Sequence, residues 1–378
     1  MAAQYQLFYP GAICESEEYL TRQIVTYIGN KRSLLGLIGK GIEAARSALG
    51  KEKITFLDLF SGSGIVSRYA RQYSSRIIAN DLESYSYLSN RCYLTNADEI
   101  SKMGLQSAFQ KLQNGLRAGF KPGFITELYA PKDEEAIQLG ERVFYTRRNA
   151  MYIDTARQLI AELPLEIQHL LLAPLLAAAS VHANTSGVFK GFYKNKQGVG
   201  QYGGDAENAL TRIRREIELE LPVFSNFNCA CEVYQEDANR LVHNLPEVDV
   251  AYFDPPYNQH PYGSNYFMLN LIASYQRPEK ISSVSGIPEG WLRSDYNKRA
   301  KAEAALFDAV DYCKARFILI SYNSEGFVSR ESFLGELQQR GEISVFDARY
   351  NTFRGCRNLR EREIAVTESL YLLDRKGK

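Results

Sequence analysis

One stretch near the N-terminus constrains the fold more than any other part of the chain. Residues 54–60 (Ile-Thr-Phe-Leu-Asp-Leu-Phe) have the apolar pattern of a buried strand, and residues 61–64 (Ser-Gly-Ser-Gly) form a turn after it. Residues 65–73 have helical spacing, and residues 76–81 are a second apolar run that ends in an acid. A strand, a turn, a helix and a second strand in this order make a βαβ unit, which needs a parallel sheet covered by helices. The sequence therefore predicts an α/β protein.

This alternation of strands and helices is interrupted once. Residues 98–226 combine helical stretches with polar and aromatic loops, and we expect helices over residues 134–139, 148–162, 165–181 and 206–219. The alternation then resumes, with strands expected over residues 228–234, 248–253, 316–322, 342–348 and 368–373 and a helix over 297–314. We therefore expect an α/β domain of residues 1–97 and 227–378, with a mainly helical domain of residues 98–226 inserted into it.

The composition sets the broad class of the protein. A chain of 378 residues with 45% apolar residues can bury a sizeable core, and its net charge of +1 does not exclude a nucleic-acid partner, because a local basic face can hide in a neutral total. The closest cysteines, Cys229 and Cys231, have no matching metal ligands nearby, so we expect reduced thiols and no metal. Without a signal pattern or 18 consecutive apolar residues, we expect a soluble, cytoplasmic chain.

Residues 254–257 (Asp-Pro-Pro-Tyr) directly follow the expected strand 248–253. Pro255 and Pro256 lack an N–H and hold φ at about −65°, so the turn is stiff. Such a turn can aim the Asp254 carboxylate and the Pro255 carbonyl, both acceptors, at the two hydrogens of one exocyclic NH₂ group. Tyr257 can then stack on the base that carries this group. The alternative is a plain Pro-Pro turn whose tyrosine packs on the core.

Further polar and glycine residues fall at the carboxyl ends of the expected strands, where open α/β sheets bind ligands. The first strand ends in a glycine turn that lets the backbone approach a ligand. Asp81 ends the second strand and can accept both hydroxyls of a ribose, while Asp237 follows the third and can face an adenine amino group. Taken singly, the glycines suit an ordinary tight turn and either aspartate suits a helix N-cap. Their order on successive strands favours one shared ligand site.

At these residues the chain resembles the amino-methyltransferases that use S-adenosylmethionine, and specifically the adenine-specific DNA methyltransferase family that includes Dam. Residues 26–31 (Thr-Tyr-Ile-Gly-Asn-Lys) look like that family's N-terminal cofactor motif, residues 58–64 like its glycine-rich methionine-binding motif, and residues 254–257 like its catalytic tetrapeptide. The resemblance implies catalytic roles for Asp254, Pro255, Pro256 and Tyr257. It implies cofactor contacts at Tyr27, Asn30, Lys31, Asp58, Phe60, Gly62, Gly64, Asp81 and Asp237.

The order of these motifs is similar to the alpha arrangement of that family, in which the long insertion is the target-recognition domain. The resemblance implies a Rossmann-like methyltransferase sheet of about seven strands, mostly parallel, with the last strand antiparallel. It implies methyl transfer from S-adenosylmethionine to the N6 amino group of an adenine in double-stranded DNA. A base inside a duplex must be flipped out to reach such a pocket. A restriction–modification system in a prokaryotic cell or phage is the implied setting, with a cognate endonuclease that acts separately.

Two segments have the composition of nucleic-acid contacts. Residues 182–196 mix lysines, aromatics and glycines, and residues 349–362 carry five arginines and one acid. Lysine and arginine can meet phosphates, and aromatic rings can stack on bases. The candidate contacts are Lys190, Tyr193, Lys194, Lys196, Arg354, Arg357 and Arg360. For the first segment the alternative is a solvated loop with Phe189 and Phe192 docked on the core.

Two rival functions remain open on the sequence. Ribosomal enzymes that methylate amino groups of RNA share the Asp-Pro-Pro-Tyr turn, and only the long insertion and the N-terminal lysine motif favour DNA. A non-catalytic subunit that binds nucleic acid within an assembly would not need Asp254, Gly62 and Gly64 intact.

Overall fold

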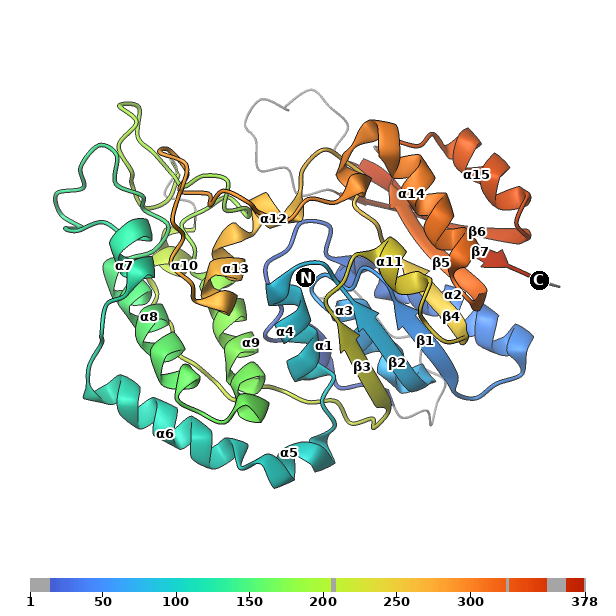
Figure 1. Cartoon of the computed structure of the whole chain (residues 1–378), viewed down its shortest axis with the longest axis horizontal. Coiled ribbons are helices and arrows are strands. Elements are labelled where there is room, and N and C mark those ends of the chain that lie inside the picture. The colour runs from blue at the N-terminus through green and yellow to red at the C-terminus, as the bar shows by residue number, and fades with distance from the viewer. Residues whose placement is uncertain (1–13, 205–208, 324–325, 352–364, 377–378) are drawn as a thin grey trace.

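The computed structural model describes residues 14–204, 209–323, 326–351 and 365–376, and the described strands form one seven-stranded sheet (Figure 1). The strand order is β3-β2-β1-β4-β5-β7-β6. The first five strands pair in parallel, and β7 is antiparallel to both β5 and β6. The strands are β1 (Ile54–Asp58), β2 (Ser74–Asn80), β3 (Ala230–Tyr234), β4 (Val248–Phe253), β5 (Ala315–Asn323), β6 (Glu342–Asn351) and β7 (Ala365–Asp374). The Rossmann-like methyltransferase sheet expected from the sequence is confirmed.

The order of the strands places a binding crevice at β1 and β4. From β1 the chain continues to β2 and β3 on one side, and from β4 it continues to β5 on the other side. The neighbouring strands β1 and β4 therefore form the topological switch point. Asp58, the last residue of β1, pairs with Tyr252 of β4. Asp254 follows two residues later, so the two acids leave the sheet at the same edge.

Helices cover both faces of the sheet because its strands are apolar on both sides. One face packs on η1 (Lys31–Leu34), α2 (Leu35–Leu49) and α3 (Ile65–Ala70), and α3 continues into η2 (Arg71–Tyr73). The other face packs on α11 (Ala238–Val242), α14 (Arg299–Tyr312) and α15 (Arg330–Gln338). Phe56 faces the first layer and Leu57 the second, as the two-residue period of a strand requires.

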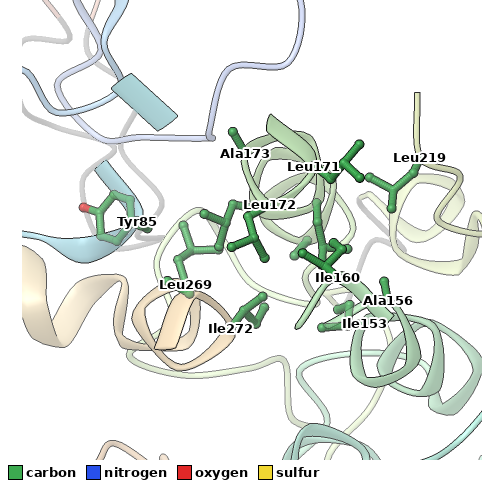
Figure 2. Close-up of a cluster of buried hydrophobic side chains, with 14 of the residues drawn as sticks. Tyr85, Ile153, Ala156, Ile160, Leu171, Leu172, Ala173, Leu219, Leu269 and Ile272 are labelled. Atoms are coloured by element: carbon green, nitrogen blue, oxygen red, sulfur yellow. The ribbon is translucent and has the colours of Figure 1, made fainter. Parts of the chain in front are cut away.

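A second, helical part lies beside the sheet, on the left of Figure 1. Its core joins α8 and α9 to α4, which belongs to the βαβ region, and to α13, which follows the Asp-Pro-Pro-Tyr turn (Figure 2). The chain therefore returns to the helical part after β4. The elements of this part and the short helices near it are α1 (Glu17–Thr21), α4 (Ser84–Tyr93), α5 (Ala97–Met103), α6 (Leu105–Ala118), α7 (Phe124–Tyr129), α8 (Arg147–Ala161), α9 (Leu165–Val181), α10 (Leu210–Arg214), α12 (Tyr262–Asn265) and α13 (Phe267–Ser274). The short helix η3 (Asp295–Asn297) packs on α14 instead, and its Tyr296 belongs to the core on that face of the sheet.

Two expected helices differ from the structure. Residues 134–139 form turns instead of a helix, because the Glu141 carboxylate accepts hydrogen bonds from the backbone N–H groups of Lys132 (2.9 Å) and Gln138 (2.7 Å) and so competes with helical bonding. Of the helix expected over residues 206–219, residues 206–208 lie outside the described residues, Leu210–Arg214 form α10, and residues 215–219 are not helical, with an extended Arg215 ending the helix. The amphipathic helix α6 was not expected. No helix among the described residues is long and apolar enough to cross a membrane.

Truncating Leu269 of α13 tests whether the helical core depends on this returning segment. Leu269 is fully buried, so Leu269→Ala should lower the free energy of unfolding by about 2–5 kcal/mol in urea denaturation. Leu165→Ala is the matched control, since Leu165 on α9 is 81% exposed and its loss should change stability by less than about 0.5 kcal/mol. Equal stability of the two variants would contradict the placement of α13 in the helical core.

Candidate active site

A cleft opens at the carboxyl ends of β1, β2 and β4, at the switch point of the sheet. It holds about 860 Å³ of empty space, part of it open to solvent. Eight of the nine residues expected to contact a cofactor line it, together with Asp254 and Pro256: Tyr27, Asn30, Lys31, Asp58, Phe60, Gly62, Asp81 and Asp237. Gly64 lies in the same turn. The structure thus brings together motifs that are more than 200 residues apart in the sequence.

The glycine turn needs glycine for two reasons. Gly62 and Gly64 have φ values of +50° and +76°, which residues with a Cβ adopt only with strain. A Cβ on Gly62 would lie 3.1 Å from the Tyr27 ring, and one on Gly64 would lie 2.8 Å from Asn90 Oδ1. The turn therefore has a backbone path and a closeness to its neighbours that only glycine allows.

Asp81 holds this turn in place. Its Oδ2 accepts a hydrogen bond from the Gly62 N–H at 2.8 Å, and its Oδ1 accepts one from the Glu83 N–H at 2.9 Å. Burial raises the pKa of Asp81, and these backbone donors oppose that effect. Glu83 also lines the cleft, and burial raises its pKa to about 7 while its carboxylate accepts from Asn270 Nδ2 at 2.6 Å. Two carboxylates thus reach the cleft at the end of β2.

Two other predicted cofactor residues have local partners of their own. Asp237 is the N-cap of α11, where its Oδ1 accepts from the Arg240 N–H at 3.1 Å, as the plainer alternative for this residue requires. Asn30 caps η1 and also donates from Nδ2 to Ser63 Oγ at 3.3 Å, which ties the N-terminal motif to the glycine turn. Both side chains still line the cleft.

Asp58 is a fully buried carboxylate beneath the glycine turn. Its Oδ2 accepts a hydrogen bond from Ser67 Oγ at 2.6 Å, whereas its buried Oδ1 has no hydrogen-bond partner among the described residues. Burial raises the pKa of Asp58 to about 7, with smaller raising effects from Asp254 and Asp81. An unsatisfied buried acceptor at the wall of a cleft suits a ligand that brings a donor or a positive charge.

Asp254 lines the cleft and is also part of an ion pair. Its Oδ1 lies 3.0 Å from Lys31 Nζ, and Lys31 Nζ lies 2.9 Å from Glu368 Oε1 on β7. Burial raises the pKa of Asp254 to about 6, against the lowering effect of the ammonium. Burial alone would lower the pKa of Lys31, but the two carboxylates hold it well above its ordinary value. Since 19% of the Asp254 side chain remains exposed, the pair leaves the acid within reach of a ligand.

The rest of the Asp-Pro-Pro-Tyr turn is arranged around this acid. Pro255 is buried and Pro256 lines the cleft. The Tyr257 ring meets Tyr322 edge-on at 6.3 Å, and the Tyr257 carbonyl accepts from the Phe327 N–H at 3.2 Å. Tyr257 is near enough to Lys31 to raise its pKa, so the tyrosine flanks the ion pair.

A stack of tyrosine rings forms another wall of the cleft. Tyr27, Tyr262 and Tyr266 form a cluster of nearly parallel rings. The Tyr27 centroid lies 4.8 Å from that of Tyr262 and 4.9 Å from that of Tyr266, and the latter two are 5.9 Å apart. Tyr266 Oη accepts from the Ile28 N–H at 2.6 Å, and Tyr262 Oη donates to the Ile28 carbonyl at 3.3 Å. The loop after the catalytic turn is thereby fixed to the N-terminal motif.

The predicted nucleic-acid residues divide into two groups. Lys190, Lys194 and Lys196 are exposed on one loop, and Tyr193 is partly buried there. This loop is anchored next to the cleft, because the Phe189 N–H donates to the Asn265 carbonyl at 2.7 Å. Burial lowers the pKa of His260, and the nearby Lys190 lowers it further. Phe189 is 2% exposed, which agrees with the alternative that this ring packs on the core. Arg354, Arg357 and Arg360 lie outside the described residues.

The structure adds residues that the sequence did not single out. Leu292, Ser294, Tyr296 and Asn297 line the cleft from the segment before α14, and Tyr296 meets Phe60 edge-on at 5.0 Å. Glu368 reaches the ion pair from the last strand. An acid at the head of an apolar strand was the available signal for Glu368. The 292–297 segment has no comparable signal.

The strand order and the cleft at the switch point define a Rossmann-like methyltransferase. Comparison with known proteins narrows the class, because the sequence profile of the D12 class N6 adenine-specific DNA methyltransferases matches residues 27–331. The chain therefore belongs to the D12 class of N6 adenine-specific DNA methyltransferases. It is an adenine-specific DNA methyltransferase, and DNA is its substrate.

Individual relatives agree with this family. Type II methyltransferase M.NlaIII of Neisseria lactamica is 30% identical, over 93% of this chain and 99% of that protein. Type II methyltransferase M.CviAII of Paramecium bursaria Chlorella virus 1 is 30% identical, over 87% and 93%. Type II methyltransferase M.FokI of Planomicrobium okeanokoites is 29% identical over 83% of this chain, which spans only 47% of that longer protein.

The raised pKa of Asp58 predicts a specific pH dependence of stability. The folded protein binds a proton at Asp58 more tightly than the unfolded chain, so this residue costs stability as the pH rises from about 4 to about 7. Asp58→Asn removes the titration. The free energy of unfolding of the variant minus that of the wild type should therefore increase over this range, by on the order of 3–4 kcal/mol, and be flat above it. Chemical denaturation at several pH values measures this difference in the free energy of unfolding. If the difference does not change with pH, burial does not raise the pKa of Asp58.

Proposed function

We propose that this enzyme transfers a methyl group from S-adenosylmethionine to the N6 amino group of an adenine that is flipped out of double-stranded DNA. The observation that carries the proposal is the position of Asp254: the acid that suits an amino group lines the same cleft as the glycine turn that suits the cofactor. Among the described residues there is no cluster of His, Cys, Asp and Glu side chains arranged to hold a metal ion.

The residues of the cleft fit the cofactor. Gly62 gives close backbone access, and the unsatisfied Asp58 Oδ1 can receive the positive ammonium of the methionine part. Asp81 and Glu83 supply carboxylates for the ribose hydroxyls, and Asp237 and Phe60 lie where the cofactor adenine would be held. When bound, the cofactor supplies an electrophilic methyl group on its sulfonium. The remaining proposed contacts are Tyr27, Asn30, Lys31 and Gly64.

Asp254 would orient the target amino group. The N6 lone pair is delocalised into the adenine ring, so this nitrogen is a poor nucleophile until its hydrogens are accepted from one side. The Asp254 carboxylate and the Pro255 carbonyl, on a turn stiffened by Pro256, can accept both hydrogens and leave the lone pair facing the methyl donor. Holding the two reactants in this geometry can contribute on the order of 7–11 kcal/mol to lowering the barrier.

Aromatic residues would stabilise the flipped base. Tyr257 flanks Asp254 and can stack on the adenine, which offsets part of the free energy of unstacking it from the duplex. Tyr262 adds a second ring at the cleft, and its position is fixed because Tyr27 and Tyr266 stack behind it.

We assign DNA recognition to the helical part. Residues 98–226 would form the target-recognition domain, joined by α12 and α13, whose apolar side chains share its core. The catalytic domain would be residues 1–97 and 227–378. Lys190, Lys194 and Lys196, with Tyr193, stand beside the cleft where phosphates of a bound duplex would pass. Arg354, Arg357 and Arg360, which lie outside the described residues, are the other proposed phosphate contacts.

The relatives suggest the biological setting. Those reported above are named type II methyltransferases, so we propose that this enzyme is the modification enzyme of a restriction–modification system in the cytoplasm of a prokaryotic or phage-infected cell. A cognate endonuclease would recognise the same DNA site and cut it when unmethylated.

Replacing Asp254 tests the proposed chemistry. Asp254→Ala should lower the rate of methyl transfer to duplex DNA by at least about a hundredfold, the scale for losing one preorganised polar group. Asp249→Ala, at the other end of β4, removes an acid that bonds Lys51 and Thr55 outside the cleft and should keep near-normal turnover. Incorporation of labelled methyl groups into DNA and into ribosomal RNA is the measurement. Near-normal turnover of Asp254→Ala, or labelling of RNA alone, would refute the proposal.

Replacing Gly62 tests the cofactor site without relying on turnover. Gly62→Ala places a Cβ against Tyr27 and should weaken binding of S-adenosylhomocysteine, the product form of the cofactor, by at least about tenfold in calorimetry. Gly50 has a similar φ of +63° with nothing within 4 Å of its Cβ position, so Gly50→Ala carries the same backbone strain without the contact. Unchanged binding by Gly62→Ala, or equal weakening by both variants, would place the cofactor elsewhere.

A further inference from the structure

A second carboxylate, that of Glu368, lies behind the Asp254–Lys31 ion pair. Glu368 is 1% exposed, its Oε1 lies 2.9 Å from Lys31 Nζ, and the same oxygen accepts a hydrogen bond from Ser321 Oγ at 2.6 Å. A buried carboxylate is costly unless it is paired and hydrogen-bonded, so its site is built to hold it. The proposed reaction so far gives this residue no role.

The strand pairing places Glu368 at the edge of the sheet where the parallel strands end and the cleft opens. Glu368 pairs with Asn323 at the carboxyl end of β5, because β7 runs antiparallel to that strand. β5 is parallel to β4, with Ile320 opposite Phe253, the last residue of β4, and β5 continues to Asn323. Glu368 therefore lies at the same edge of the sheet as the Asp-Pro-Pro-Tyr turn, which follows the end of β4.

The charges of the cluster show what Glu368 changes. An ammonium group has three donors and no acceptor, and Lys31 is close to both carboxylates. Its positive charge is thus shared between two acids, and the cluster of Asp254, Lys31 and Glu368 carries a formal charge of −1. Without the Glu368 charge, the ammonium would act on Asp254 alone and would be free to turn further towards it.

We propose that Glu368 is a positioning residue for methyl transfer: it holds Lys31 from behind, and thereby fixes the direction of the Asp254 carboxylate and preserves its strength as an acceptor. The inference rests on the proposed role of Asp254 towards the target amino group. Glu368 is not itself among the residues that line the cleft, and it acts on Asp254 through Lys31, which does line it.

The electrostatics of Asp254 give the inference a measurable sign. Burial is the largest influence on the pKa of Asp254; Lys31 lowers that pKa and Glu368 raises it. Replacing Glu368 with a neutral side chain removes a raising effect, so the pKa of Asp254 should fall. The other titratable groups in electrostatic contact with this cluster include Asp58 on β1, Tyr252 on β4, Tyr257 in the turn, Tyr262 on α12 and Tyr371 on β7, and the substitution replaces none of them.

The test compares Glu368→Gln with the wild type in two measurements. The first is the single-turnover rate of methyl transfer to adenine in duplex DNA as a function of pH. We expect the plateau rate to fall by at least about tenfold, towards the hundredfold that a 1 Å misplacement can cause. We expect the acid limb of the profile to move to lower pH by about one unit, the low end of the effect of a nearby charge. The second is NMR titration of the Asp254 carboxyl in the free protein, which should show the same downward shift.

Two variants separate positioning from stability. Asp374→Asn removes another ion-paired acid of β7, which contacts Arg316 at 2.6 Å at the far end of the strand, and should leave the plateau and the acid limb unchanged. Glu368→Asp keeps the charge but is one methylene shorter, so it should retain the wild-type acid limb with a reduced plateau rate. If Glu368→Gln does not fold, this variant decides the question.

The outcomes that overturn the inference are distinct. A Glu368→Gln variant with the wild-type plateau and acid limb excludes a positioning role, as does a lower plateau without any shift of the acid limb or of the Asp254 titration. A wild-type rate for Glu368→Asp excludes it too. A wild-type protein that methylates no adenine would instead reject the proposed function, and the inference with it.

Discussion

A single buried ammonium group joins the parts of the chain on which the active site depends. Lys31 enters from the N-terminal motif, Asp254 from the end of β4 and Glu368 from the last strand, and the two contacts of 3.0 Å and 2.9 Å leave little freedom to any of them. Because all three side chains are largely removed from water, each would be costly without the others. The closure of the cleft around Asp254 therefore depends on an electrostatic balance as well as on packing. In the proposed mechanism, these same contacts set both the position of Asp254 and its strength as an acceptor.

Much of this site was predictable from the sequence, because backbone-determined features carry their own signals. Gly62 and Gly64 follow an apolar strand, Asp81 ends the next one, and Asp254 begins a stiff turn after a third. In a parallel sheet such strand ends lie together, so the cleft follows from topology. The strand positions and the antiparallel last strand were confirmed for the same reason. The hydrogen-bond and ion-pair partners of individual side chains were not predictable. Lys31, expected at the cofactor, forms ion pairs with Asp254 and Glu368.

The sequence was least informative where tertiary packing or side-chain bonding decides the structure. The helix expected over residues 134–139 is lost to hydrogen bonds from backbone N–H groups to Glu141. α13 packs in the helical core through apolar side chains. From the sequence alone, such side chains are equally compatible with packing against the sheet. α12 and α13 directly follow the Asp-Pro-Pro-Tyr turn, so this packing connects the helical part to the proposed catalytic residues. Tyr262 of α12 stacks on Tyr27 of the N-terminal motif. A movement of the helical part on DNA would therefore displace Tyr262 relative to this motif.

The central claim is that one cleft holds the methyl donor and the target amino group side by side, with Asp254 facing the latter. The most direct measurement is a crystal structure of the protein with S-adenosylhomocysteine and a DNA duplex that contains its target adenine. The account predicts the adenine outside the helix, with its N6 within hydrogen-bonding distance of Asp254 and the cofactor sulfur against the turn at Gly62. A cofactor bound away from that turn, or an adenine whose amino group faces another residue while Asp254 contacts Lys31 alone, would contradict it.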